Sequence, residues 1–204
     1  MRASVVTQSR ISSSCHATSA RDRLSRVLDI HLCASPGVID FGPDPESERW
    51  LESSPAPPGS VARRVRLLDR ILIVVAIPDG TETPSALRRM LVASAGKPNL
   101  LVVREGWLRR QPRFSILSML VHCSDIRVSP TDWILVEQHL VSQGGTSDLG
   151  DCAAVVLRDQ DPVQAVLALV AQHRLHIDRS RPLSAFSSIS LSVRRHRGRR
   201  VVGG

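Results

Sequence analysis

The chain has 204 residues, of which 42% are hydrophobic and 23% charged, values typical of a globular protein. Its formal net charge is +8 and its sequence pI is about 11.0, and Lys97 is the only lysine among 27 basic residues. No apolar run reaches the length of a membrane span, and the composition excludes a collagen, a coiled coil and a disulfide-dense mini-protein.

The first 60 residues are predicted to lie outside the folded domain. Residues 1–33 form a basic leader rich in Ser and Arg. Its first 21 residues contain no acid and resemble an organellar transit peptide, and Arg23–Leu32 is a candidate amphipathic helix. An unstructured leader is the alternative. Residues 34–60 hold six prolines and three glycines and are predicted to be a linker, with an amphipathic turn around Glu46–Leu51. We expect a cytoplasmic protein, with organellar targeting as the alternative.

The predicted folded domain covers residues 61–178. Ile71–Ile77 is a seven-residue apolar run, typical of a strand buried on both faces, and Leu100–Val103 is a second short strand. Between them, Thr83 and Pro84 have the residue types that begin a helix, and Gly96 has the type that ends one.

The second half of this domain predicts further strands and one more helix. Trp133–Val136 and Ala153–Leu157 are short and β-prone, so both are predicted strands, whereas Ile116–Val121 suits either a strand or a helix. Asp161 followed by proline predicts a helix start, and Leu175–Ile177 a last strand.

Alternating strands and helices predict an α/β fold with a small doubly wound, Rossmann-like, mostly parallel sheet. Residues 179–204 are predicted to be a basic flexible tail. In such sheets, ligands bind beyond the carboxyl ends of the strands. Asp79, Glu137 and Arg158 follow predicted strands and are therefore the candidate binding residues.

Three segments carry a resemblance to a known family. DRILIVVAIPDGTETPSALRRML, TDWILVEQHLVSQGGTSDL and AAVVLRDQDPVQAVLALVA resemble parts of response-regulator receiver domains. The family has an acidic pair where Val75 and Ala76 stand, a phosphoacceptor aspartate in place of Glu137, and a lysine in place of Arg158. The resemblance therefore implies a degenerate pseudo-receiver that is not phosphorylated and acts through protein contacts.

An enzymatic alternative depends on four carboxylates whose spacing is similar to that of PIN-domain ribonucleases. In that family, clustered acids hold Mg²⁺ or Mn²⁺, and the metal activates a water molecule against a phosphodiester. The residues in question are Asp69, Glu105, Asp151 and Asp178. Solvated surface carboxylates are the simpler interpretation.

Most of the excess positive charge lies at the two ends of the chain. The C-terminal tail contains five arginines within seven positions and no acid, namely Arg194, Arg195, Arg197, Arg199 and Arg200. Because arginines neutralise phosphates, this tail is a candidate nucleic-acid contact. A solvated, non-specific tail is the alternative.

The four cysteines form no CxxC pair and predict buried thiols, without a structural metal site. The sequence therefore predicts a non-catalytic regulatory or binding module with no cofactor. Its partners are a protein or a second copy of the chain, with nucleic acid at the basic tail. A metal-dependent nuclease and a reading frame without a specific function are the two alternatives.

Overall fold

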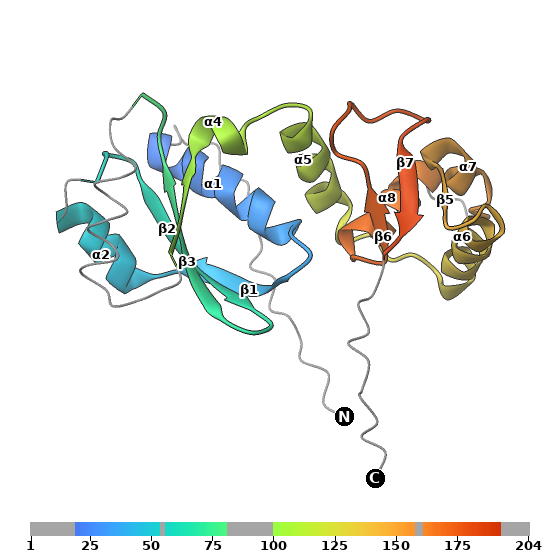
Figure 1. The fold of residues 1–204 in the computed structure, drawn as a ribbon, viewed down its shortest axis with the longest axis horizontal. Coiled ribbons are helices and arrows are strands. Elements are labelled where there is room, and N and C mark those ends of the chain that lie inside the picture. Colours follow the sequence, from blue (N-terminus) through green and yellow to red (C-terminus); the bar gives the residue numbers. More distant parts are fainter. Residues whose placement is uncertain (1–18, 54–55, 81–99, 158–160, 193–204) are drawn as a thin grey trace, which may run out of the picture. The chain divides into compact units, whose positions relative to one another are not determined.

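The computed structural model describes residues 19–53, 56–80, 100–157 and 161–192 (Figure 1). The chain divides into unit 1, residues 1–117, and unit 2, residues 118–204, and the boundary falls inside helix α5 (Arg113–Cys123). Both units combine helices with strands, so the mixed α/β class predicted from the sequence is confirmed. Ile116–Val121, for which strand and helix were both open, belongs to a helix.

Unit 1 is built on a four-stranded sheet in the order β1-β2-β3-β4. Its strands are β1 (Val38–Pro43), β2 (Val61–Leu67), β3 (Ile71–Ile77) and β4 (Leu100–Arg104). The β1–β2 and β2–β3 pairs are antiparallel, and only β3 and β4 are parallel. The strands predicted at β3 and β4 are thus confirmed, whereas the mostly parallel, doubly wound sheet is not.

A tight hairpin explains the antiparallel pairing. The Leu67 N–H donates to the Arg70 carbonyl at 2.8 Å, so the chain reverses immediately between β2 and β3. A parallel neighbour would need a crossover of a dozen or more residues, and three residues cannot supply one. The predicted helix between Thr83 and Gly96 lies outside the described residues.

Helices cover both faces of this sheet. Helix α1 (Ala20–Cys33) buries Leu24, Val27 and Leu28 against Val65 and Val74 on one face. Helix α2 (Pro45–Ser53) buries Leu51 against the other face, where Ala62, Ile73, Val75 and Ile77 lie. Strands β2 and β3 are therefore sandwiched between two apolar clusters.

The predicted leader and linker thus contain structural elements of unit 1. Residues 20–33, 38–43 and 45–53 form α1, β1 and α2, and they pack onto β2 and β3. The second part of the leader folds because Ser19 and Asp22 form a capping box at the start of α1, and because its apolar residues recur at helical spacing on the buried side. The predicted linker contains a strand and a helix because Pro43 and Pro45 stand at the ends of these elements, where proline does not interrupt them.

A buried arginine connects the two helices to the sheet. Arg63 on β2 donates to the Asp29 carboxylate at 2.8 and 3.2 Å and also to the Ser25 hydroxyl, both on α1. Its Nη1 donates to the Ala62 carbonyl at 3.0 Å and lies 3.5 Å from Glu48 on α2. One guanidinium therefore joins three elements.

Unit 2 consists of a three-stranded antiparallel sheet and packed helices. After α5 come α6 (Pro130–Ser142), β5 (Thr146–Asp148), α7 (Leu149–Ala154), α8 (Pro162–Ala171), β6 (Leu175–Ile177) and β7 (Ser188–Leu191). The strand order is β5-β7-β6. Helix α8 forms the centre of the core, because every residue from Ala165 to Val170 is buried.

Two predicted strands of unit 2 are wrong, and two predicted elements are confirmed. Trp133–Val136 belongs to α6, and Ala153–Leu157 begins in the last residues of α7 and continues into a turn. The helix that starts at Asp161 and the strand Leu175–Ile177 are both present as α8 and β6. The prediction of a flexible tail over residues 179–204 is wrong for residues 188–191, because these form β7.

Local capping explains why Trp133–Val136 is helical. Ser129 is the N-cap of α6, Pro130 is its first residue, and the Asp132 N–H donates to the Ser129 hydroxyl at 3.0 Å. The Asp132 carboxylate is 1% exposed, and it accepts from the Ser129 hydroxyl at 2.6 Å and from the Leu157 N–H at 3.2 Å. These bonds start the helix and attach it to the segment after α7.

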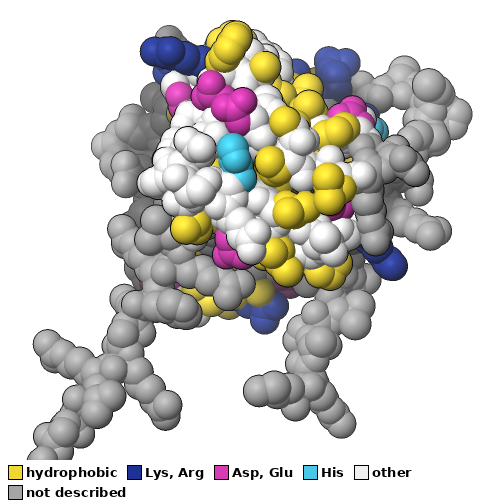
Figure 2. Space-filling model, turned by 90° about the vertical axis from the view of Figure 1, so that its right-hand side faces the viewer, with side chains coloured by type: hydrophobic (Ala, Val, Ile, Leu, Met, Phe, Trp, Pro, Cys, Tyr) yellow, Lys and Arg dark blue, Asp and Glu magenta, His cyan; other side chains and the backbone are white. Residues whose placement is uncertain are grey.

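The surface of unit 2 carries apolar side chains on α6. Ile134 is 48% exposed and Val141 is 62% exposed, and seven residues separate them, so they share one helix face. Figure 2 shows hydrophobic side chains spread over the side of the molecule that holds α6 and α7, with arginines at the margins of the view. Among the described residues, no helix is both long and apolar enough to cross a membrane.

We predict that Arg63→Met destabilises unit 1 by about 3 kcal/mol, because it leaves Asp29 partly buried without its cation. Urea unfolding followed by circular dichroism measures the change. Arg66→Met is the matched control, because Arg66 is exposed on the same strand and lies 4.0 Å from Asp40, and it should cost about 0.5 kcal/mol or less. Equal losses in the two variants would contradict a structural role for Arg63.

We predict that Asp132→Ala destabilises unit 2 by about 2 kcal/mol, because the Ser129 hydroxyl and the Leu157 N–H lose a buried acceptor. Thermal unfolding measures this loss. The control is Asp125→Ala, which removes an exposed carboxylate four residues before the cap. If the two variants have the same melting temperature, Asp132 does not stabilise the attachment of α6.

Candidate functional site

The sequence-predicted binding residues lie in different parts of the chain. Asp79 follows β3 and lies against α4 (Glu105–Leu108), where a Cβ added to Gly106 would be 2.8 Å from the Asp79 carboxylate. Because β3 and β4 are parallel, their carboxyl ends meet at this edge, as expected. Glu137, however, lies on α6 in unit 2 rather than after a strand, and Arg158 is outside the described residues.

The four carboxylates of the nuclease interpretation have separate local settings. Asp69 is exposed in the β2–β3 turn, and Glu105 accepts from the Arg109 Nε at 2.7 Å. In unit 2, Asp151 lies on α7, and Asp178 accepts from the Ser180 N–H and hydroxyl. These bonds from Ser180 lower the pKa of Asp178.

The nuclease alternative needs clustered metal ligands, and the basic tail is the predicted nucleic-acid contact. Within the described ranges, no group of three or more His, Cys, Asp or Glu side chains could hold a metal ion. The five tail arginines, residues 194–200, lie outside the described residues. Cys123 and Cys152 are buried, and burial raises the pKa of the Cys152 thiol to about 11, whereas Cys33 is exposed.

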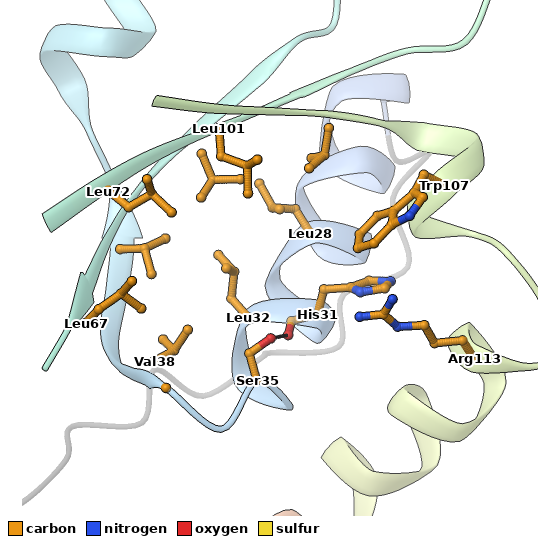
Figure 3. Close-up of a pocket in the computed structure, with 14 residues that line it drawn as sticks. Leu28, His31, Leu32, Ser35, Val38, Leu67, Leu72, Leu101, Trp107 and Arg113 are labelled. Atoms are coloured by element: carbon orange, nitrogen blue, oxygen red, sulfur yellow. Dashed lines mark hydrogen bonds between the residues drawn. The ribbon is translucent and has the colours of Figure 1, made fainter. Parts of the chain in front are cut away.

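Unit 1 contains a pocket of about 250 Å³ beside α1 (Figure 3). Its floor is the sheet, and its sides are the end of α1, the start of β1, helix α4 and the first residue of α5. The aliphatic lining side chains are Leu28, Leu32, Val38, Val65, Leu67, Leu72, Val74, Leu101 and Val103.

One end of the pocket is polar and aromatic. His31 of α1 is 5% exposed, and its Nε2 lies 2.6 Å from the Leu108 carbonyl. The Trp107 ring lies 5.6 Å from the His31 ring, and the Arg113 guanidinium carbon lies 4.7 Å from the Trp107 ring centroid. Figure 3 shows the guanidinium close to the imidazole, on the side of the pocket that Trp107 closes.

Sequence reasoning did not find this pocket. His31 falls within the candidate amphipathic helix Arg23–Leu32, and Trp107 belongs to no motif in the sequence. Arg113 had no distinguishing signal, because it is one of 26 arginines. The only usable clue was a histidine on the apolar face of a predicted helix.

Comparison of this chain with family models, curated proteins and solved structures finds no match. The receiver resemblance therefore remains a prediction. Function has to be argued from the geometry of the two units.

A histidine in unit 2 gives a pH-dependent prediction. His173 follows α8 with a left-handed φ of 60°, and burial, with a smaller effect of Arg179, lowers its pKa. Folding therefore favours neutral His173, so its stabilising contribution is complete above about pH 6.5 and declines as the pH falls below that value. We expect the melting temperature of His173→Gln to fall less than that of the unmodified chain between pH 7 and 5.

His176→Gln is the control for this experiment, because His176 is exposed on β6. Its melting temperature should follow the unmodified chain across the same range. An unchanged pH profile in His173→Gln would show that His173 does not couple folding to protonation.

Proposed function

We propose that the chain is a binding module whose unit 2 is a winged-helix-like domain that contacts nucleic acid. The observation that carries this proposal is the order of its elements, helix, strand, helix, helix, strand, strand, with the sheet order β5-β7-β6. Winged-helix domains, which are helix-turn-helix variants followed by a β-hairpin, have this arrangement. Helices α7 and α8 correspond to the helix pair, and residues 178–187 form the hairpin loop.

The composition of α8 limits how such a domain could bind. A helix that reads base edges needs exposed polar side chains, such as Arg, Asn or Gln. Helix α8 has the sequence PVQAVLALVA, is buried from Ala165 to Val170, and begins at the acidic N-cap Asp161. We therefore propose contacts with the phosphate backbone that do not depend on base sequence.

Basic side chains in unit 2 support contacts at the hairpin and the tail. Arg181 is exposed in the hairpin loop, where Phe186 is 82% exposed. The described part of unit 2 as a whole has more acidic than basic side chains. The acids are Asp125, Asp132, Glu137, Asp148, Asp151, Asp161 and Asp178, and the arginines are Arg127, Arg174, Arg179 and Arg181. Affinity for phosphates must therefore come chiefly from the five arginines that follow β7 in sequence.

A protein partner is the second candidate, and the exposed apolar face of α6 favours it. Ile134 and Val141 share that face and have no charged residue between them except Glu137. This is the interpretation closest to the pseudo-receiver hypothesis, in which the chain acts through protein contacts. It predicts no salt-dependent binding to nucleic acid.

We predict that replacing Arg194, Arg195, Arg197, Arg199 and Arg200 by Gln weakens duplex DNA binding and flattens its salt dependence. Each lost phosphate contact removes about 0.9 from the log–log slope, so the change for five arginines can reach about 4.5. Fluorescence anisotropy between 50 and 200 mM salt, on two duplexes of unrelated sequence, measures both quantities. The two duplexes should bind equally.

The matched control replaces the same five arginines by Lys and should keep the slope. Arg181→Glu should weaken binding further, whereas Arg127→Glu, outside the hairpin and the tail, should have a smaller effect. Identical slopes in the Gln and Lys variants would contradict phosphate binding by the tail. An unmodified chain that does not bind either duplex would favour the protein partner.

A further inference from the structure

We propose that the pocket of unit 1 binds a small apolar carboxylate, with the carboxylate at Arg113 and the hydrocarbon part against the sheet. This inference is independent of the nucleic-acid function proposed for unit 2, because every residue that lines the pocket belongs to unit 1. It depends on three features of the pocket: an apolar body, a single cation and a limited volume.

The body of the pocket selects a hydrocarbon. Nine of its fourteen lining residues are Leu or Val, and they come from α1 and all four strands of the sheet. Leu101 remains 46% exposed at this surface, so a bound apolar group would remove it from water. Water gains few hydrogen-bond partners among such side chains, and an apolar ligand is therefore the better occupant.

Arg113 selects an anion. Some other arginines of unit 1 are paired with carboxylates, as Arg63 is with Asp29 at 2.8 Å and Arg109 with Glu105 at 2.7 Å. Arg113 is half-buried and contacts the Trp107 ring, but within the described residues it has no ion pair, and no Asp or Glu lines the pocket. A partly desolvated guanidinium with open donors favours a carboxylate, which it can bind with two parallel hydrogen bonds.

The surrounding groups hold this end of the pocket in place. The His31 ring contacts the Leu108 carbonyl through Nε2 and stacks on Phe114 with ring centroids 6.2 Å apart. The Ser35 hydroxyl donates to the His31 carbonyl at 2.6 Å and thereby fixes the end of α1. The imidazole and the indole are therefore walls beside the guanidinium, as Figure 3 shows.

The volume sets the size of the ligand. The 250 Å³ of the pocket equals about eight water volumes, and it lies just below the usual range of small-molecule sites. A molecule of about eight to ten non-hydrogen atoms fits this space. Hexanoate, octanoate and benzoate have this size and combine one carboxylate with an apolar body.

The test compares ligands of one length that differ only in their head group. Octanoate, octan-1-ol and octylamine are titrated into the full chain by isothermal calorimetry, with tryptophan fluorescence as a second readout. We expect octanoate to bind at least about tenfold more tightly than octan-1-ol, and octylamine to show no measurable binding. Among linear carboxylates, affinity should stop rising near octanoate.

Two variants locate the binding. Arg113→Gln should reduce octanoate affinity about tenfold or more and leave octan-1-ol unchanged. Leu101→Trp, at the exposed edge of the pocket, should abolish binding of both. Thermal unfolding of each variant verifies the fold, and Arg113→Met, which also removes the charge, replaces Arg113→Gln if that variant does not fold.

Equal affinity for octanoate and octan-1-ol, or equal octanoate affinity in Arg113→Gln and the unmodified chain, would overturn the anion specificity. No binding of any carboxylate to the folded chain, or octanoate binding that survives Leu101→Trp, would overturn the site itself.

Discussion

The buried guanidinium of Arg63 is the interaction on which unit 1 depends. A charge placed inside a protein is stable only with partners, and Arg63 finds them on α1, through Ser25 and Asp29, and on α2, through Glu48. Arg21 extends the network, because it lies 3.6 Å from Glu48 and 3.1 Å from Glu52. The network holds α1 at the angle at which Leu28, His31 and Leu32 form one side of the pocket. A structural ion pair and a candidate binding site are therefore linked through one helix.

The direction of the strands determines where the sequence could correctly place ligand-binding residues. The rule that places ligands beyond the carboxyl ends of strands applies to parallel neighbours, and only β3 and β4 are parallel here. Asp79 therefore lies against α4 at the end of a parallel pair. Glu137, by contrast, lies within α6, and Arg158 comes after α7 in sequence, in a unit whose sheet is antiparallel. The three candidate residues were assigned to one sheet, whereas the described residues form two.

The elements that the sequence predicts are those with strong local signals. The apolar run of β3, the Asp161–Pro162 start of α8 and the helical stripe of α1 are readable within ten or so residues. Strand β2 was missed because arginines interrupt its apolar pattern, although Arg64 and Arg66 simply point to solvent while Val65 is buried. The β-prone run WILV predicts a strand, whereas the Ser129 cap and Pro130 make it part of helix α6. The pocket could not be read at all, because His31, Trp107 and Arg113 meet only through the tertiary fold.

The high pI gains a specific meaning once the arginines are divided by what they contact. Arg21, Arg63 and Arg109 are paired with carboxylates. Their charges are largely neutralised in these ion pairs and add little to the electrostatic potential outside the protein. The arginines that can recruit an anion are those without such a pair, and in the described part of unit 1 Arg113 is one that also borders a pocket. In unit 2 the described arginines are outnumbered by acids, which leaves the tail arginines as the chief source of attraction for phosphates. Net charge alone would predict one diffuse polyanion-binding surface, whereas the pairing pattern predicts two separate sites with different chemistry.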